Sequence, residues 1–258
     1  MRIFAYRDYH RRHYSLVASG QYERSLRLLE AIAGRDKISV LDVGCGSGAF
    51  LAEASDDYDC AGIELTEGAA AKANENSGVP VTLLEGALDA DRRFDVIRLG
   101  HVLTATPEPE GMLRSLEPLL ARRGMFLIET ALERNPSLTF WSASTVKWIR
   151  RTLRTDEPGV WVPTLFWRSD QRALRRFFSE RMEYETLHFE VFEDGWPVWT
   201  PADIPTTSSD RIRFGIARLA VGLASHRSPL AGRLGNKAVL VVQPNWAQPR
   251  PLSPAKSG

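Results

Sequence analysis

The hydrophobic and polar positions of this chain predict strands that alternate with helices. Five short, mainly apolar runs are typical of buried strands, at residues 38–43, 58–64, 79–84, 94–99 and 124–130. Segments with helical spacing or many alanines stand beside them, at residues 21–33, 66–76 and 112–120. This alternation favours an α/β fold: a Rossmann-like, doubly wound, mostly parallel sheet with helices on both faces.

The pattern changes after residue 130. Residues 131–168 are rich in tryptophan, arginine and proline, as in a cap over a binding crevice. A helix at 170–178, a strand at 182–192, a helix at 211–224 and a strand at 238–242 then complete seven strands. We expect four regions: an N-terminal helical lid at 1–36, a core at 37–132, the cap and last elements of the same sheet at 133–243, and a disordered tail at 244–258, where proline, serine and lysine dominate.

A glycine-rich turn follows the first predicted strand. Gly44, Gly46 and Gly48 can adopt positive φ and let a ligand approach the backbone closely. The helix expected from about Ala49 would point its unpaired N–H groups at that ligand. The spacing from Gly44 to Ala49 also fits a relaxed dinucleotide fingerprint, and a tight loop without a ligand is a third reading.

An acidic residue ends the second predicted strand. Glu64 is placed to accept the two hydroxyls of a ribose, and its charge would repel a 2′-phosphate on that sugar. The alternative is that Glu64 caps the next helix or is simply solvated. The glycine turn that precedes it favours the ribose role.

Residues 41–48, Leu-Asp-Val-Gly-Cys-Gly-Ser-Gly, resemble motif I of class I S-adenosylmethionine-dependent methyltransferases. Four further blocks continue the resemblance in order, at residues 94–97, 101–103, 107–109 and 119–129, and the nearest type is the ubiquinone-biosynthesis O-methyltransferases. The resemblance implies that S-adenosylmethionine lies along the carboxyl ends of the strands. It places Glu64 on the ribose, Leu65 near the adenine, and Gly44 to Gly46 beside the methionine moiety.

The loops after the first four strands should meet at one crevice, because ligands of an open parallel sheet bind outside the carboxyl ends of its strands. We expect cofactor contacts from Asp42, Gly44, Cys45, Gly46, Glu64, Leu65, Ala87, Leu88 and Gly100. Many relatives carry an acid after the glycine of the third loop, where this chain has Ala87. The adenine amino group would therefore need backbone groups or Asp89.

Three other residues depart from the family pattern and bear on the chemistry. Thr104 and Ala105 stand where some relatives have a glutamate and a histidine, and Thr164 replaces a later histidine. We therefore expect no metal and no base from these positions. His101 remains as the candidate catalytic base near the transferable methyl group. The alternative is that His101 bonds the backbone and shapes the pocket.

The composition limits the kinds of partner that we expect for this protein. The net charge is +1 over 258 residues, so no global field attracts nucleic acid, and the two cysteines form no disulfide framework. The first residues lack an apolar signal region, and no segment is long enough to span a bilayer, so we expect a cytoplasmic enzyme.

Residues 6–14, with tyrosines and arginines, could close over the cofactor as a lid or form an exposed basic helix. Residues 146–154 could rest on an anionic membrane, although a solvated cap helix is favoured.

These observations favour an S-adenosylmethionine-dependent methyltransferase that methylates an oxygen of a small or lipid-linked acceptor. One alternative is a protein that binds S-adenosylmethionine but performs other chemistry or none. The other is an NAD-dependent oxidoreductase, which only the glycine spacing supports. Nothing in the pattern indicates an oligomeric state.

Overall fold

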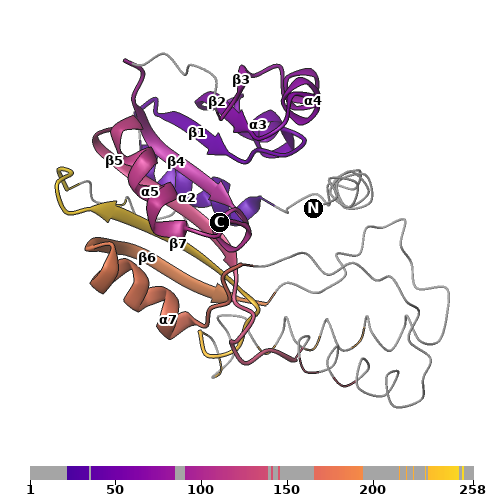
Figure 1. The fold of residues 1–258 in the computed structure, drawn as a ribbon, viewed down its shortest axis with the longest axis vertical. Coiled ribbons are helices and arrows are strands. Elements are labelled where there is room, and N and C mark those ends of the chain that lie inside the picture. The colour runs from indigo at the N-terminus through magenta and orange to yellow at the C-terminus, as the bar shows by residue number, and fades with distance from the viewer. Residues whose placement is uncertain are drawn as a thin grey trace.

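Seven strands form one sheet in the computed structural model, which describes residues 22–34, 36–84, 91–138, 166–193 and 232–249 together with seven single residues. The strands are β1 (Ser39–Val43), β2 (Asp59–Glu64), β3 (Val81–Leu83), β4 (Phe94–Gly100), β5 (Leu120–Ala131), β6 (Tyr184–Phe192) and β7 (Lys237–Pro244). Their order is β3-β2-β1-β4-β5-β7-β6, and β7 runs antiparallel to both of its neighbours, β5 and β6, whereas every other pair of adjacent strands is parallel (Figure 1). The predicted mostly parallel, doubly wound sheet is confirmed.

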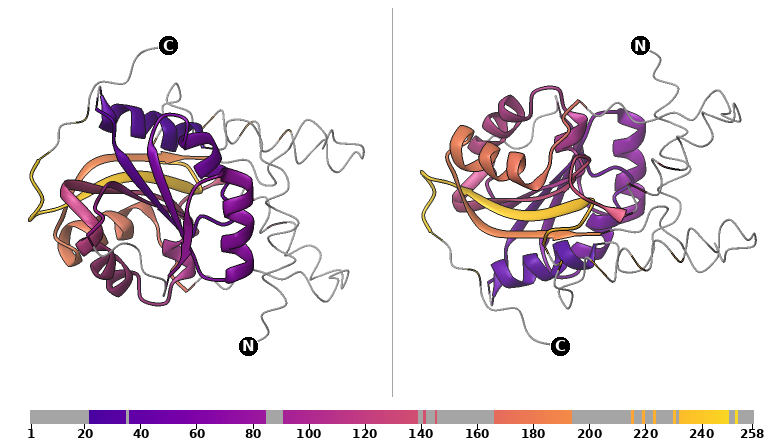
Figure 2. Two further views of the ribbon diagram at one scale, coloured as in Figure 1. Left: turned by 90° about the horizontal axis from the view of Figure 1, so that it is seen from above. Right: turned by 90° about the horizontal axis from the view of Figure 1, so that it is seen from below.

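Helices cover both faces of this sheet, as Figure 2 shows. The helices are α2 (Glu23–Ala33), α3 (Ala49–Ala54), α4 (Glu67–Ser77), α5 (Pro109–Leu116) and α7 (Gln171–Arg176). Apolar side chains of α2, α3 and α4 pack on one face of the sheet, against residues such as Val40 and Val96. Those of α5 and α7 pack on the other face, against Leu41 and Ile97. Side chains alternate across a strand, so each buried strand supplies both cores.

Local signals explain where several helices begin and end. The Thr66 hydroxyl accepts from the Ala69 amide at the start of α4, and Gly78 ends this helix at a φ of 66°. The helix predicted at 112–120 is displaced. It begins at Pro109, whose fixed φ suits a first turn, and a 3₁₀ turn (Glu117–Leu119) ends it before β5. Leu120 is thus a strand residue, because it pairs with Phe94 of β4.

Order continues past residue 244, where we placed the start of a disordered tail. Pro244 belongs to β7, and the amide of Gln248 donates to the carbonyl of Arg122 at 2.9 Å. The indole of Trp246 donates to Glu117 at 2.9 Å. β-pairing and these hydrogen bonds hold residues 244–248 against the sheet, despite a polar, proline-rich composition.

Several predicted segments lie outside the described residues. These are the first part of the lid at 1–21, the loop at 85–90, most of the cap at 139–165, and most of the helix at 211–224. Within the described ranges, no helix has the length and apolar character needed to cross a membrane.

Candidate functional site

The glycine turn after β1 has the predicted left-handed geometry. Gly44, Gly46 and Gly48 have φ values of 69°, 60° and 77°. The amides of Gly44 and Cys45 both donate to the carbonyl of Ile63, which ties the turn to the end of β2. A Cβ at Gly44 would stand 2.6 Å from Val102, so this glycine is also needed for packing. The turn therefore combines a ligand-accessible backbone with a fixed position.

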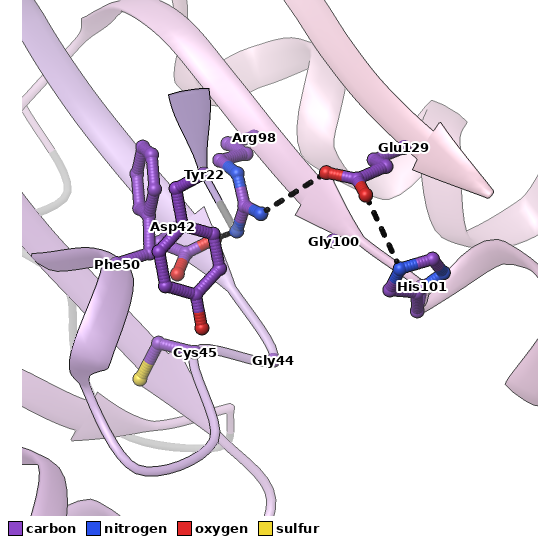
Figure 3. Close-up of a pocket in the computed structure, with 9 residues that line it drawn as sticks. All are labelled: Tyr22, Asp42, Gly44, Cys45, Phe50, Arg98, Gly100, His101 and Glu129. Atoms are coloured by element: carbon purple, nitrogen blue, oxygen red, sulfur yellow. Dashed lines mark hydrogen bonds and ion pairs between the residues drawn. The ribbon is translucent and has the colours of Figure 1, made fainter. Parts of the chain in front are cut away.

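A pocket opens beside this turn, at the carboxyl ends of β1, β4 and β5 (Figure 3). It is lined by Tyr22, Asp42, Gly44, Cys45, Phe50, Arg98, Gly100, His101 and Glu129. Five of these residues were predicted from the sequence: Asp42, Gly44, Cys45, Gly100 and His101. The structure thus brings the motif I loop and the candidate base to one place. This is the edge where open parallel sheets bind their ligands, outside the carboxyl ends of the strands.

Four ionisable side chains form a connected chain across the pocket. Arg98 Nη1 donates to Asp42 Oδ1 at 2.8 Å, and Arg98 Nη2 lies 3.7 Å from Glu129 Oε2. His101 Nε2 lies 3.4 Å from Glu129 Oε1. The Arg98 and Asp42 side chains are only 5% and 1% exposed. Arg98 extends beneath Gly100, where a Cβ would meet the guanidinium at 2.6 Å. Its guanidinium also lies 4.0 Å from the ring centroid of Phe50.

Burial and pairing shift the pKa values of these groups in different directions. Burial raises the pKa of Asp42, and Arg98 offsets this only in part. Burial alone would also raise the pKa of Glu129, but His101, Arg98 and Lys237 outweigh it and lower the value to about 2. Partial loss of hydration and the Lys237 charge lower the pKa of His101 against the opposing effect of Glu129. At neutral pH the pocket therefore holds a neutral imidazole beside an ionised carboxylate.

Within this network of four side chains, two buried polar atoms have no hydrogen-bond partner among the described residues: Asp42 Oδ2 and Arg98 Nε. One is an acceptor and the other a donor. An α-amino acid group carries the complementary pair, an ammonium and a carboxylate. An unpaired buried polar atom costs free energy, and the two groups of an α-amino acid would pair both atoms. The floor of the pocket therefore fits the amino-acid end of S-adenosylmethionine.

Glu64 and Leu65 lie at the end of β2, beyond the residues that line this pocket. The Glu64 carboxylate is buried, and its Oε2 accepts from the amide of Leu65 at 2.6 Å. Burial raises the pKa of Glu64, while hydrogen bonds from the amides of Leu65 and Gly46 oppose the rise. A carboxylate can accept about four hydrogen bonds, so two sites remain for ribose hydroxyls. Leu65 is exposed, whereas Ala87 and Leu88 lie outside the described residues.

The remaining side chains considered for reactive chemistry are uncharged. Burial is the largest cause of a raised pKa at Cys45, with Asp42 and Glu64 adding to it, so its thiol stays protonated. A protonated, buried thiol is a poor nucleophile. Thr104 is buried and Leu103 packs in the core. Among the residues that the structure describes, no three His, Cys, Asp or Glu side chains form a possible metal site.

Sequence reasoning missed Tyr22, Phe50, Arg98 and Glu129. Arg98 and Glu129 carried a signal, because each is a charged residue within a mainly apolar strand predicted to be buried. Such residues need a partner, and they find each other because β4 and β5 are adjacent. Tyr22 and Phe50 carried no comparable signal. They meet edge to face, with ring centroids 5.5 Å apart, only when α2 packs against α3.

Comparisons with known proteins show the family and the fold of the chain. The sequence model of a methyltransferase-domain family matches residues 10–201, well over half of the chain. No curated protein gives a significant sequence match. Among solved structures, the plantazolicin methyltransferase BamL, in complex with a triazolic desmethylPZN analog and SAH, is 14% identical with a TM-score of 0.52. That match covers 88% of this chain and 86% of BamL.

Two other solved structures show the same likeness. A SAM-dependent methyltransferase from Archaeoglobus fulgidus is 16% identical, with 85% and 91% of the two chains covered and a TM-score of 0.50. A chain from the complex of the Haloferax volcanii Trm112 methyltransferase activator with a putative methyltransferase is 13% identical. It gives coverages of 86% and 90% and a TM-score of 0.52. At such identities the likeness establishes the fold.

Proposed function

The chain belongs to the methyltransferase-domain family, and we propose that this class I, S-adenosylmethionine-dependent enzyme methylates a hydroxyl oxygen of a small or lipid-linked acceptor, with His101 as general base. One observation carries the proposal: the motif I turn, the unpaired Asp42 oxygen and His101 line a single pocket. The alternative of an NAD-dependent oxidoreductase rested on glycine spacing alone, and the family match decides against it.

Residues of β1, β4 and β2 would share the binding of the cofactor. Asp42 Oδ2 would accept from the ammonium group, while Arg98 Nε offers a donor for the carboxylate. The glycine turn lets the cofactor lie against the backbone between Asp42 and Glu64. Glu64 would accept the ribose hydroxyls, and the exposed side chain of Leu65 would lie on the adenine. When bound, S-adenosylmethionine supplies an electrophilic methyl group on a positively charged sulfur.

His101 would act on the acceptor. Its imidazole is 39% exposed at the edge of the pocket, so an acceptor can reach it, and its lowered pKa keeps it neutral and able to take a proton. Removal of the hydroxyl proton leaves an oxygen that can form the new bond to carbon. An aliphatic or phenolic hydroxyl needs such a base, whereas an uncharged amine does not. This requirement favours methylation of oxygen.

The acceptor pocket would be shaped largely by the cap. Its basic stretch at 146–154 lies outside the described residues, as do the lid tyrosines at 6–14. Peripheral contact with a membrane, a lipid-linked acceptor and a cytoplasmic location therefore remain proposals from the sequence. The exposed Trp141 and Phe166 are described, and they flank the part of the cap for which we expect an aromatic acceptor wall.

Calorimetry tests the cofactor assignment. We expect S-adenosylhomocysteine to bind and NAD not to bind, and NAD binding without S-adenosylhomocysteine binding would overturn the proposal. Transfer of a labelled methyl group can then be followed on paired acceptors that differ only in a hydroxyl or an amine. Preference for the amine would refute methylation of oxygen while leaving the cofactor assignment intact.

A further inference from the structure

The carboxylate of Glu129 is shared between two sides of the pocket. Oε2 accepts from the hydroxyl of Ser25 at 3.4 Å and lies 3.7 Å from Nη2 of Arg98. Oε1 lies 3.4 Å from Nε2 of His101. Contacts from α2 and β4 therefore hold one oxygen, and they direct the other towards the imidazole (Figure 3).

The backbone of Glu129 holds His101 as well. His101 has a φ of 60°, a left-handed conformation that only one other described non-glycine residue adopts. Its amide donates to the carbonyl of Glu129 at 2.7 Å, next to the β4–β5 pair formed by Gly100 and Glu129. A strained conformation of this kind persists only where neighbours fix it, and it is common at functional sites. Glu129 thus contacts both the main chain and the side chain of His101.

We propose that Glu129 is a positioning residue for His101: its carboxylate accepts the hydrogen of Nε2 and leaves Nδ1 as the nitrogen that takes the proton of the acceptor. The hydrogen bond at one ring nitrogen decides which nitrogen of a neutral imidazole is free to act as a base. When Nδ1 takes the proton, the O–H bond breaks, its electron pair stays on the acceptor oxygen, and the new imidazolium faces the carboxylate. The inference rests on the proposed function, because it assigns the reactive nitrogen of the proposed base.

The surrounding charges keep Glu129 in the required form. The pKa of Glu129 is lowered to about 2, so the group is an ionised carboxylate that can only accept a hydrogen bond. Three charged groups bear on the histidine: Lys237, Arg98 and Glu129. Arg98 and Lys237 also bear on the Glu129 carboxylate, and Asp42 pairs with Arg98. Lys237 and Arg98 lower the pKa of His101, and Glu129 opposes them. Glu129 is therefore the group that opposes the loss of basicity of the imidazole.

Nitrogen-15 NMR of the unaltered protein tests the proposal without turnover. Above the pKa of His101, we expect one dominant tautomer in which Nε2 carries the hydrogen and Nδ1 does not. A spectrum in which Nε2 lacks the hydrogen would overturn the inference. Assignment uses the His101→Ala variant, whose missing signals identify the residue among the five histidines.

A matched pair of variants tests the cause. Glu129→Gln should lower the pKa of His101, mix the two tautomers, and shift the acid limb of the kcat/KM profile by the same amount. Glu190→Gln removes a carboxylate from a second His–Glu contact outside the pocket and should leave the His101 signals unchanged. An unaltered His101 pKa and tautomer in Glu129→Gln would overturn the inference.

The two proposals fail separately. Wild-type turnover in His101→Ala would remove the general base from the proposed function, whatever the tautomer. The tautomer of His101 in the unaltered protein tests only the role of Glu129. This test can be made even if the Glu129→Gln variant does not fold.

Discussion

Two groups of histidine, glutamate and arginine occur in the described structure, and they differ in their surroundings. The pocket group is His101, Glu129 and Arg98. The surface group lies on β6 and α2, where Arg24 Nε is 3.2 Å from Glu190 Oε1 and His188 Nε2 is 3.8 Å from Glu190 Oε2. The residue types are the same, but Glu190 is 41% exposed at its side chain and Glu129 only 9%.

This difference shows that proximity of the three residue types does not make a site. Water competes for the exposed side chains of Arg24 and Glu190, so their ion pair is weak and can be remade in other geometries. In the pocket, the buried side chains of Arg98 and Glu129 depend on each other for a partner of opposite charge. The left-handed backbone of His101 fixes the position of its imidazole. The glycine turn lies beside the pocket group and not beside the surface group. We therefore expect changes in the pocket to be large and the matched changes on the surface to be small.

The largest contrast should come from the two histidines. His101→Ala should lower turnover by about 10²–10⁴-fold, the usual contribution of a general base. His188→Ala should leave turnover near that of the unaltered enzyme. Rates with a saturating acceptor check this, and equal losses in both variants would break the comparison.

The two arginines should differ in their effect on folding. Arg98→Met leaves Asp42 and Glu129 buried without their cation, which costs about 3–5 kcal/mol of unfolding free energy. Arg24→Met removes an exposed ion pair worth about 0–1 kcal/mol. Urea denaturation measures both values. A similar small loss in each would mean that the Arg98 network is not held by its charges.

Removal of the carboxylate at position 64 sharpens the comparison by testing the cofactor without touching either group. Glu64→Ala should weaken S-adenosylhomocysteine binding by roughly 1.5–3 kcal/mol, the contribution of hydrogen bonds to a charged acceptor. The exposed Glu75 of α4 provides the control, because Glu75→Ala should not change the affinity. Calorimetry would contradict the ribose role if both variants bound equally well.

Acid should affect stability through Glu129. Its pKa falls from 4.5 to about 2 on folding, so its stabilising contribution is complete above pH 4.5 and is lost as the pH falls towards 2. His101 acts in the same direction, since its lowered pKa makes folding less favourable once the pH falls below 6.5. Glu129→Gln should therefore flatten the fall in stability between pH 4.5 and 2. Denaturation curves across this range would show no such change if the pairing were absent.

The smallest expected effect is that of a chelator. Thr104 and Ala105 offer no metal ligands at the end of the fourth strand, and the described residues hold no cluster suited to a metal ion. Turnover should survive an excess of EDTA. Loss of activity that magnesium restores would place a metal beside the pocket and change the role of its carboxylates.

Much of the architecture could be predicted because it depends on local patterns. Apolar runs located every strand of the sheet to within a few residues, and the glycines at 44, 46 and 48 indicated their left-handed turn. Boundaries set by pairing were less accurate. Leu120 was assigned to a helix because its apolar neighbours fit a helical period, but pairing with Phe94 makes it the first residue of β5.

The sequence by itself determined the fold, the glycine turn and the nomination of His101, because strand periodicity and left-handed turns depend on neighbouring residues. Only the tertiary structure decided which partners His101 has. Arg98 and Glu129 are 31 positions apart and act together because β4 and β5 pair in parallel. Tyr22 joins them from α2, across the face of the sheet. The environment of a buried charge depends on groups that are distant in sequence, and no local pattern encodes it.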